Sequence, residues 1–494
     1  MSGPTPAGRT VPAVDVAVVG AGAAGLYAAL CAAREGARVA LVSATPLAQT
    51  ASYWAQGGLA AALASDDSAE LHLADTERAG RGAVRRSAAE VLVAEAPERV
   101  RDLEALGVRF DADRFGRLAL GLEGGHSVRR VVHAGGSATG RRLLRQLSAL
   151  AVHEPGIEVI EGSRVAALLS TEGVCHGLAC EDGRVVQARA VILSTGGAAA
   201  LWARTTNPPG SQGSGLLLAR RVGAALADLE LVQFHPTAVT GVRGREGFLV
   251  SEAIRGEGAT LLDATGERFV DELAPRDEVA RAVWLRLTAT GAGSVGLDMR
   301  AIDPARFPNV FSALRDAGLD PSVELVPVAP AAHYVMGGIV TDLDARSNVA
   351  GLYAVGEAAC TGLHGANRLA SNSLSECFVF GGRAAARALS ESPVALASEA
   401  ALRDLAAQPG PPAPSAETRA ALWARAGLER TRKDLEELLD DPHPLCRMIA
   451  ACALAREETR GAHVRIDFPE RDAALDGHHT LLRGDAEPRF ERWD

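Results

Sequence analysis

One loop of the sequence is rich in side chains that could hold an anionic ligand. Residues 351–376 begin with an apolar run, contain several glycines, and end where Ser371 and Ser373 predict the start of a helix. Glycine turns let backbone amides approach a ligand, and a helix N-terminus favours an anion. Arg368 lies in this loop, and its planar guanidinium can bond both oxygens of a carboxylate. We interpret the loop as ligand-facing; an ordinary strand-to-helix connection is the alternative. Its other polar candidates are Glu357, His364, Asn367 and Asn372.

A second glycine-rich turn, near the start of the chain, predicts binding of a dinucleotide. The apolar run 14–19 is followed by Gly20, Gly22 and Gly25, then by a helical pattern and a second apolar run. A strand, this glycine spacing and a helix form the βαβ fingerprint, in which a pyrophosphate rests on the helix N-terminus. NAD-binding proteins place an acidic residue at the end of the second strand, but Ser43 stands there. The departure disfavours NAD as the dinucleotide.

Four further residues have side chains suited to proton transfer or ligand binding. Glu252 and Arg255 are three residues apart and would face each other on a helix. A plain salt bridge is the alternative to a proton relay. An arginine is a poor base by itself because its pKa lies above ~12. His235 and His333 are isolated, and a lone histidine is more often structural than a ligand. Their roles therefore depend on what surrounds them.

The elements that would position these residues predict an α/β fold. We expect a Rossmann-like dinucleotide-binding domain, an inserted α+β capping domain and a C-terminal helical domain. The predicted segments are 14–230 for the first part of the dinucleotide domain, with a β-meander at about 157–193, then 231–330 for the capping domain, 331–395 for the second part of the dinucleotide domain and 416–494 for the helical domain.

Bulk composition excludes some classes of function. The chain has 494 residues and a net charge of −10, which argues against nucleic acid as a partner because phosphate binding needs a basic face. The seven cysteines form no CxxC pair, so we expect reduced thiols and no metal site. No apolar run is long enough to cross a bilayer, and no secretory signal is recognisable. We expect a cytoplasmic protein without a membrane anchor.

Several segments together resemble the flavoproteins of the succinate dehydrogenase / fumarate reductase family. The resemblance is carried by 351–376, by Ala-Ser-Tyr-Trp-Ala-Gln-Gly-Gly at 51–58, by Gln-Phe-His-Pro-Thr at 233–237 and by His-Tyr-Val-Met-Gly-Gly at 333–338. It implies FAD as the cofactor. In the membrane-complex members a histidine five residues before the glutamine of the second motif bonds covalently to the flavin. Ala51 stands there in this chain, so non-covalent FAD is expected.

The resemblance also implies which residues contact FAD. Relatives carry an acidic residue where this chain has Ser214, so one contact is altered. The expected cofactor-binding residues are Gly20, Ala21, Gly22, Ala23, Ala24, Gly25, Ser43, Ala51, Ser52, Tyr53, Trp54, Ala55, Gln56, Gly57, Gly58, Thr195, Gly196, Gly197, Ser214, Glu357, Asn372, Ser373 and Leu374.

For a four-carbon dicarboxylate, the resemblance implies an anchor at each end. The expected substrate-binding residues are His235, His333, Arg368, Ser251 and Glu123. Arg276 aligns with the proton-transferring arginine of the family, and Glu252 and Arg255 align with its relay. These three residues and Glu123 form the expected catalytic set.

Glu123 separates the branches of the family. The dehydrogenase and reductase branch has an uncharged residue there. A carboxylate would repel succinate but pair with the ammonium group of L-aspartate, a discrimination of ~1–3 kcal/mol on the scale of charged hydrogen bonds. A surface glutamate in a glycine turn is the alternative interpretation.

The resemblance therefore implies FAD-dependent oxidation of L-aspartate to iminoaspartate, with hydride transfer from the α-carbon to flavin N5. FAD would be reoxidised by O₂, giving H₂O₂, or by fumarate. This reaction is the first step of de novo NAD biosynthesis and implies functional coupling to quinolinate synthase. Two alternatives stay open. One is the flavoprotein subunit of a membrane fumarate reductase or succinate dehydrogenase-type enzyme, which Ala51 and Glu123 oppose. The other is a flavin-binding protein without turnover, which His235, His333 and Arg368 oppose.

Overall fold

The strand–turn–helix unit predicted from the glycine-rich turn at 20–25 is present in the computed structural model, which describes residues 13–47, 50–392 and 397–494. β1 (Val14–Val19) leads into α1 (Ala23–Arg34), and β2 (Val39–Val42) pairs with β1 in parallel. The turn requires glycine for space, because a Cβ atom at Gly25 would lie 1.9 Å from the carbonyl oxygen of Gly20. The N-terminus of α1 can therefore approach the end of β1 closely.

Replacing Gly25 by Ala is expected to destabilise the folded protein by about 1–3 kcal/mol, because the added methyl group would overlap the backbone of the turn. Gly22→Ala is the matched control, since a Cβ atom there would meet only the hydroxyl of Ser52, at 3.2 Å. Urea unfolding of the two FAD-free variants measures the difference. Equal stabilities would contradict the close packing of this turn.

The main sheet has seven strands and is mostly parallel. Its order is β6-β2-β1-β9-β8-β7, and β16 also pairs with β9. The strands not yet given are β6 (Ile157–Ile160), β7 (Val165–Thr171), β8 (Val174–Cys180), β9 (Val185–Leu193) and β16 (Leu352–Ala354). Because β6 continues the parallel sheet beside β2, the antiparallel meander predicted at about 157–193 begins only at β7. The carboxyl ends of β1, β9 and β16 share one edge, where ligands of doubly wound sheets bind.

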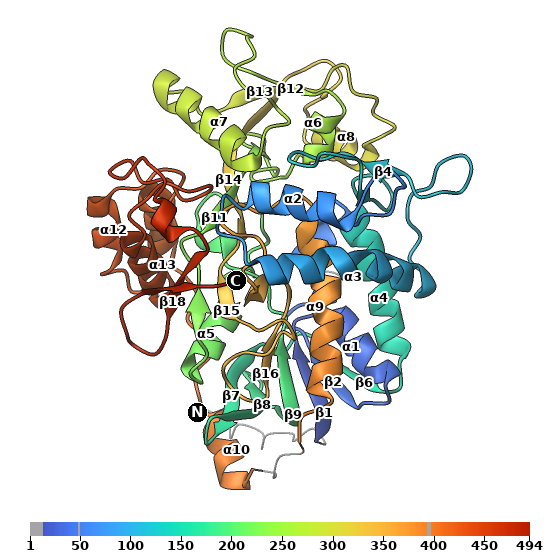
Figure 1. Ribbon diagram of the computed structural model, residues 1–494, viewed down its shortest axis with the longest axis vertical. Coiled ribbons are helices and arrows are strands. Elements are labelled where there is room, and N and C mark those ends of the chain that lie inside the picture. Colours follow the sequence, from blue (N-terminus) through green and yellow to red (C-terminus); the bar gives the residue numbers. More distant parts are fainter. Residues whose placement is uncertain (1–12, 48–49, 393–396) are drawn as a thin grey trace, which may run out of the picture.

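Helices cover one face of this sheet, and one of them, α9 (Asn372–Ala388), begins at the end of the glycine-rich loop of 351–376. α9 packs against α1 and α3 (Arg86–Ala105), and α4 (Thr139–His153) packs on the other side of α1 (Figure 1). The rings of Tyr27 and Phe378 meet edge to face at 5.2 Å between α1 and α9. α2 (Ala69–Ala79) lies against α3. The buried side of α9 thus fixes the loop that precedes it.

The capping region forms its own layer at one end of the molecule (Figure 1). Its antiparallel sheet has the order β11-β14-β13-β12. The strands are β11 (Val232–Val239), β12 (Thr260–Leu262), β13 (Val295–Asp298) and β14 (Val326–Val335), and the helices are α6 (Glu252–Gly256), α7 (Arg276–Thr290) and α8 (Pro308–Arg315). A separate hydrophobic core fills this layer. β11 and β14 pair from Val232 and Val335 onward and connect the cap to the rest of the chain.

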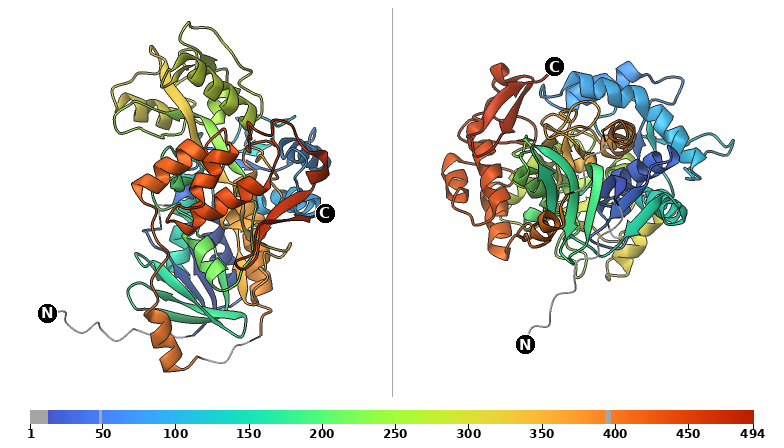
Figure 2. Two further views of the ribbon diagram at one scale, coloured as in Figure 1. Left: turned by 90° about the vertical axis from the view of Figure 1, so that its left-hand side faces the viewer. Right: turned by 90° about the horizontal axis from the view of Figure 1, so that it is seen from below.

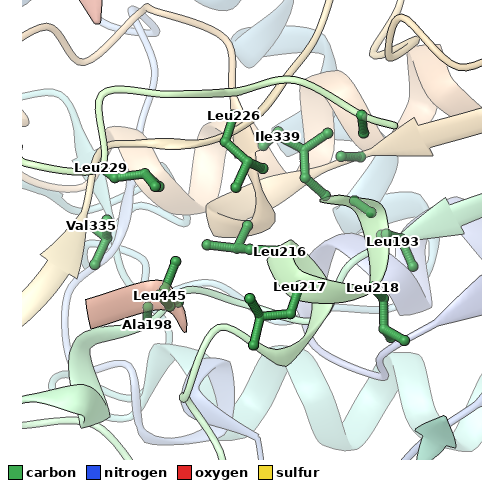
Figure 3. Packing of buried hydrophobic residues seen from close by; sticks show 14 of the residues in the cluster. Leu193, Ala198, Leu216, Leu217, Leu218, Leu226, Leu229, Val335, Ile339 and Leu445 are labelled. Atoms are coloured by element: carbon green, nitrogen blue, oxygen red, sulfur yellow. The ribbon is translucent and has the colours of Figure 1, made fainter. Parts of the chain in front are cut away.

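The C-terminal region agrees with the helical prediction through three helices and then departs from it. α11 (Ala416–Arg425), α12 (Arg432–Leu438) and α13 (Pro444–Ala455) lie together on one side of the molecule (Figure 2). Leu445 of α13 lies in one cluster with Leu216 and Leu217 of α5 (Ser214–Arg221) (Figure 3). After α13 the chain forms β18 (His478–Leu482) and β19 (Arg489–Arg492), which were not predicted.

Two smaller sheets join distant segments of the chain. β18 pairs with β10 (Leu226–Ala227) in a sheet that also holds β15 (Gly338–Val340) and β17 (Ala359–Cys360). β5 (Val131–Val132) pairs with both β3 (Leu59–Ala60) and β4 (Leu120–Gly121). This second sheet brings the predicted flavin loop at 51–58 beside the turn that contains Glu123. Among the described residues, no helix combines the length and apolar character needed to cross a bilayer.

Candidate functional site

Most of the predicted site residues converge on one cavity between the sheet edge and the cap. The cavity has about 1430 Å³ of empty space, including its open mouth. The predicted residues that line it are Gly22, Ala23, Ala24, Ala51, Ser52, Trp54, Ala55, Gln56, Gly57, Gly58, Glu123, Gly196, His235, Ser251, Glu252, Arg276, His333, Glu357, Arg368, Ser373 and Leu374.

The remaining predicted residues are not part of the cavity lining. Ser43 is buried and its hydroxyl donates to the carbonyl of Thr45 at 2.6 Å. Ser214 is the first residue of α5, where the expected acidic contact is missing. The full set outside the lining is Gly20, Ala21, Gly25, Ser43, Tyr53, Thr195, Gly197, Ser214, Arg255 and Asn372.

The side chain of Asn372, a predicted cofactor-binding residue, does not line the cavity. This side chain is fully buried against α2, where its Nδ2 donates to Thr76 Oγ1 at 3.0 Å and its Oδ1 lies 2.8 Å from His72 Nε2. Asn372 is the first residue of α9, and the first turn of a helix directs neighbouring side chains to different faces. Ser373 and Leu374, which follow it, line the cavity instead.

The half of the cavity next to α1 suits the pyrophosphate of a dinucleotide. The N-terminus of α1 opens into it at Gly22, and the hydroxyl of Ser52 accepts a hydrogen bond from the backbone N–H of Ala23 at 3.2 Å. A helix N-terminus supplies unpaired N–H groups to an anion. Glu357 lies further along this half and accepts from the backbone N–H of Val335 at 3.0 Å. Burial raises the pKa of Glu357 to about 7. These residues fit FAD.

The other half of the cavity contains two buried arginines that share one acceptor. Arg276 begins α7 and donates from Nη1 to Oε1 of Gln233 at 3.1 Å. Arg368 donates from Nη2 to the same oxygen at 3.1 Å and from Nη1 to Ser373 Oγ at 2.8 Å. In the part of the chain that the structure describes, no carboxylate forms an ion pair with Arg368, and its Nε is buried without a partner. The two guanidinium groups form a pocket for an anion.

The charge of Arg368 is retained in this environment. Burial, followed by the nearby charge of Arg276, lowers the pKa of Arg368 to about 10. The side chain is 4% exposed. It therefore stays cationic at neutral pH and presents an unneutralised charge to a ligand.

Two histidines complete the anion pocket as neutral donors. His235 on β11 and His333 on β14 have ring centroids 5.1 Å apart. The backbone N–H of Thr237 donates to Nδ1 of His235 at 3.3 Å, which leaves the proton on Nε2. This Nε2 is buried and has no hydrogen-bond partner among the described residues. Burial holds the pKa of both histidines well below the ordinary value, so both are neutral.

Glu252 connects Arg276 to a second buried arginine. Its Oε2 accepts from Nε of Arg276 at 2.6 Å, and its Oε1 lies 3.5 Å from Nη2 of Arg255. Arg255 does not reach the cavity and donates from Nη1 to the carbonyl of Glu272. A Cβ atom at Gly124 would lie 2.0 Å from Oε1 of Glu252. The three charged groups are continuous from the cavity inward, as the predicted relay requires.

Glu123 is a buried carboxylate that lines the cavity. Its Oε2 accepts from the hydroxyl of Ser371 at 2.6 Å, and its Oε1 lies 3.3 Å from Nε2 of His133. Burial favours the neutral form of this carboxyl. The hydrogen bonds from His133 and Ser371 and the charge of Arg276 outweigh burial and lower its pKa to about 2. Glu123 is therefore anionic at neutral pH, and the surface alternative does not apply because it is 2% exposed.

Sequence reasoning assigned no role to several residues that the fold brings to the site. Gln233 lies two residues before His235, and Ser371 lies between Arg368 and Ser373, so both were inside motifs already noticed. Nothing in the sequence marked the segment 206–208. The unassigned residues that line the cavity are Ser194, Thr206, Asn207, Pro208, Gly247, Phe248, Leu249, Tyr334, Val355, Gly356, Ser371 and Cys377.

Comparison with known proteins agrees with this geometry. The family described as FAD binding domain matches residues 15–374, and the family described as fumarate reductase flavoprotein C-term matches residues 438–493. Among solved structures, one of E. coli quinol fumarate reductase has a TM-score of 0.88 at 29% sequence identity, covering 98% of this chain and 97% of that chain.

Curated relatives place the chain within one branch of these flavoproteins. The L-aspartate oxidase of Agrobacterium fabrum is 45% identical over 482 residues, covering 92% of this chain and 91% of the relative. The L-aspartate oxidase of Caulobacter vibrioides is 45% identical over 511 residues, covering 95% of this chain and 98% of the relative. The chain therefore belongs to the L-aspartate oxidases, FAD-dependent oxidoreductases of the succinate dehydrogenase / fumarate reductase flavoprotein family.

Proposed function

We propose that the protein oxidises L-aspartate to iminoaspartate in this cavity. Separate groups of the protein would bind the two carboxylates and the amine of the substrate. This assignment rests on two observations made among the described residues: the buried guanidinium of Arg368 has no ion-pair partner, and Nε2 of His235 has no hydrogen-bond partner. Buried charges are costly unless they are paired, so a site of this kind is completed by an anionic ligand. Arg368 would bind one carboxylate through both oxygens, with His235 and His333 as neutral donors.

Glu123 would recognise the amine. Its carboxylate is anionic, lines the cavity and lies near enough to Arg276 to be influenced by its charge. An ammonium group would replace the weak contact with His133, whereas succinate would offer Glu123 only apolar or negative groups. Ser251 lines the same end of the cavity and is proposed as a further substrate contact.

The proton would leave through Arg276 and Glu252. FAD supplies the hydride acceptor, at N5, when it is bound. Removal of one hydride from the α-carbon and one proton from the ammonium group leaves the protonated form of iminoaspartate. Arg276 can take that proton only while it passes one of its own to Glu252, whose Oε2 accepts from Nε at 2.6 Å. Arg255, 3.5 Å from the other oxygen of Glu252, would continue the route inward.

The proposed reaction also implies an electron acceptor and a use for its product. We propose that the reduced protein passes its electrons to O₂, giving H₂O₂, or to fumarate. We propose that iminoaspartate is consumed by quinolinate synthase in de novo NAD biosynthesis in the cytoplasm.

An anaerobic reduction experiment tests the proposed substrate. Protein loaded with FAD is mixed without oxygen with L-aspartate, D-aspartate or succinate, and the visible absorbance of the flavin is followed. We expect L-aspartate to bleach the flavin fastest. Bleaching by succinate but not by L-aspartate would instead assign the chain to the fumarate reductase type of reaction, and no bleaching by any of the three would refute oxidation of a dicarboxylate.

A further inference from the structure

We propose that Tyr334 is a positioning residue whose ring holds the guanidinium of Arg368 in place for the substrate carboxylate without neutralising it. The guanidinium carbon of Arg368 lies 4.5 Å from the ring centroid of Tyr334, and both residues line the cavity. The inference rests on the carboxylate-binding role proposed for Arg368. No role for Tyr334 followed from the sequence motifs.

The need for such a support comes from the charge balance around Arg368. Its other contacts, Ser373 Oγ and Gln233 Oε1, are neutral, and Arg276 repels it across the same Gln233 oxygen. The carboxylates of Glu357 and Glu123 favour the cation, but neither forms an ion pair with Arg368 among the described residues. A carboxylate partner would stabilise the cation but would compete with the substrate for it. The face of an aromatic ring attracts a cation by ~2 kcal/mol in a desolvated site and leaves its hydrogen-bond donors free.

A chain of buried hydrogen bonds fixes the ring itself. The hydroxyl of Tyr334 donates to Glu376 Oε2 at 3.2 Å and lies 3.2 Å from His364 Nε2. The same oxygen of Glu376 lies 2.9 Å from His364 Nε2, and Thr361 donates to Oε1 of Glu376 at 2.8 Å. Glu376 is on α9 and Tyr334 is on β14, so the hydrogen bond between them fixes the ring of Tyr334 relative to a second element.

In this arrangement the ring of Tyr334 lies between the carboxylate of Glu376 and the guanidinium of Arg368. Glu376 accepts from the phenol and so enriches the ring in electrons, which strengthens its attraction for Arg368. Burial, with the charge of Glu376 next, raises the pKa of Tyr334 well above its ordinary value, so the hydroxyl keeps its proton. The carboxylate of Glu376 thereby supports the binding site without occupying it.

The test is a double-mutant cycle on the full-length, FAD-loaded protein. Tyr334→Leu is expected to weaken succinate binding, and to raise KM for L-aspartate, by about 30-fold, the equivalent of ~2 kcal/mol, with less than about threefold change in kcat. Tyr334→Phe keeps the ring and should stay within about threefold of the parent protein. In an Arg368→Gln background, Tyr334→Leu should have no further effect on succinate binding, because the group that it positions is gone.

A second buried tyrosine provides the structural control. Tyr353 on β16 donates from its hydroxyl to Glu391 Oε1 at 2.6 Å and lies outside the cavity. Tyr353→Leu should lower Tm and leave KM unchanged. Tyr334→Met replaces Tyr334→Leu in the cycle if the leucine variant does not retain FAD.

The outcomes separate the two proposals. If Arg368→Gln leaves succinate binding unchanged, the carboxylate role of Arg368 fails, and the positioning role of Tyr334 fails with it. If Arg368→Gln weakens binding but Tyr334→Leu does not, only the positioning role is overturned. Equal effects of Tyr334→Leu in both backgrounds, or a loss in kcat with KM unchanged, would also overturn it.

Discussion

Replacing Arg276 by glutamine is expected to lower kcat for L-aspartate by about 10²- to 10⁴-fold, the usual contribution of a positioned proton-transfer group. The reason is geometric. Arg276 lines the cavity next to the anion pocket and donates a hydrogen bond to Glu252, whereas Arg255 does not reach the cavity. Glutamine keeps a polar side chain but cannot pass a proton to Glu252. Steady-state turnover and single-turnover anaerobic flavin reduction both measure the loss.

The same substitution elsewhere on α7 is the control. Arg286 lies on this helix, its side chain is 42% exposed, and its nearest acidic partner is Asp263 at 3.5 Å. Arg286→Gln should leave kcat within about twofold of the parent protein, as is usual for surface changes. A large rise in KM with kcat unchanged in Arg276→Gln would show that Arg276 only binds the substrate, and the proton route would have to be reassigned.

Glu123→Gln is expected to lower kcat/KM for L-aspartate by about 10- to 100-fold, corresponding to ~1–3 kcal/mol for a charged hydrogen bond. The reduction of fumarate should be spared, because fumarate has no ammonium group to lose. Glu98→Gln, on the exposed side of α3, is a matched control that should change neither reaction. Equal losses in both reactions would contradict the proposed role of Glu123.

The pH dependence of substrate choice follows from the charge of Glu123. A carboxyl whose pKa is lowered to about 2 loses its charge only when the pH falls toward that value. Glu123 should therefore keep its charge between roughly pH 5 and pH 8, well above that pKa, and the preference for L-aspartate over succinate that it confers should stay constant over this range. Competition between the two ligands for flavin reduction at several pH values measures this. A preference that disappears near pH 5 would assign amine recognition to another group.

Local sequence signals predicted the parts of the fold that depend on neighbouring residues. β1, the glycine turn and α1 were found because strand, spacing and helix occur within about 20 residues. β6 was assigned to the meander because a short strand does not reveal its pairing partner, and its partner is β2. β18 was missed because it completes its sheet beside β10, about 250 residues earlier in the chain.

The site shows the same division. Arg368, His235 and His333 were identified by their motifs. Among the described residues, Arg368 has no ion-pair partner and Nε2 of His235 has no hydrogen-bond partner, which could not be inferred from the sequence because it depends on three elements meeting at one cavity. The bridge from Gln233 to both arginines is non-local in the same way. The motif gives the start of α9 but not the face to which each side chain of its first turn points, so the contact of the Asn372 side chain with α2 was not foreseen.

The close approach of Gly124 to Glu252 limits how the substrate range of this protein could be altered. Any side chain at 124 would displace the Glu252 carboxylate, since even a Cβ atom would lie 2.0 Å from its Oε1. The turn that contains Glu123 therefore packs directly against the ion pair between Glu252 and Arg276. Redesign of amine selectivity through bulkier residues in this turn would thus slow deprotonation as well, and laboratory evolution toward other amino acids is expected to accept changes on the far side of the cavity first.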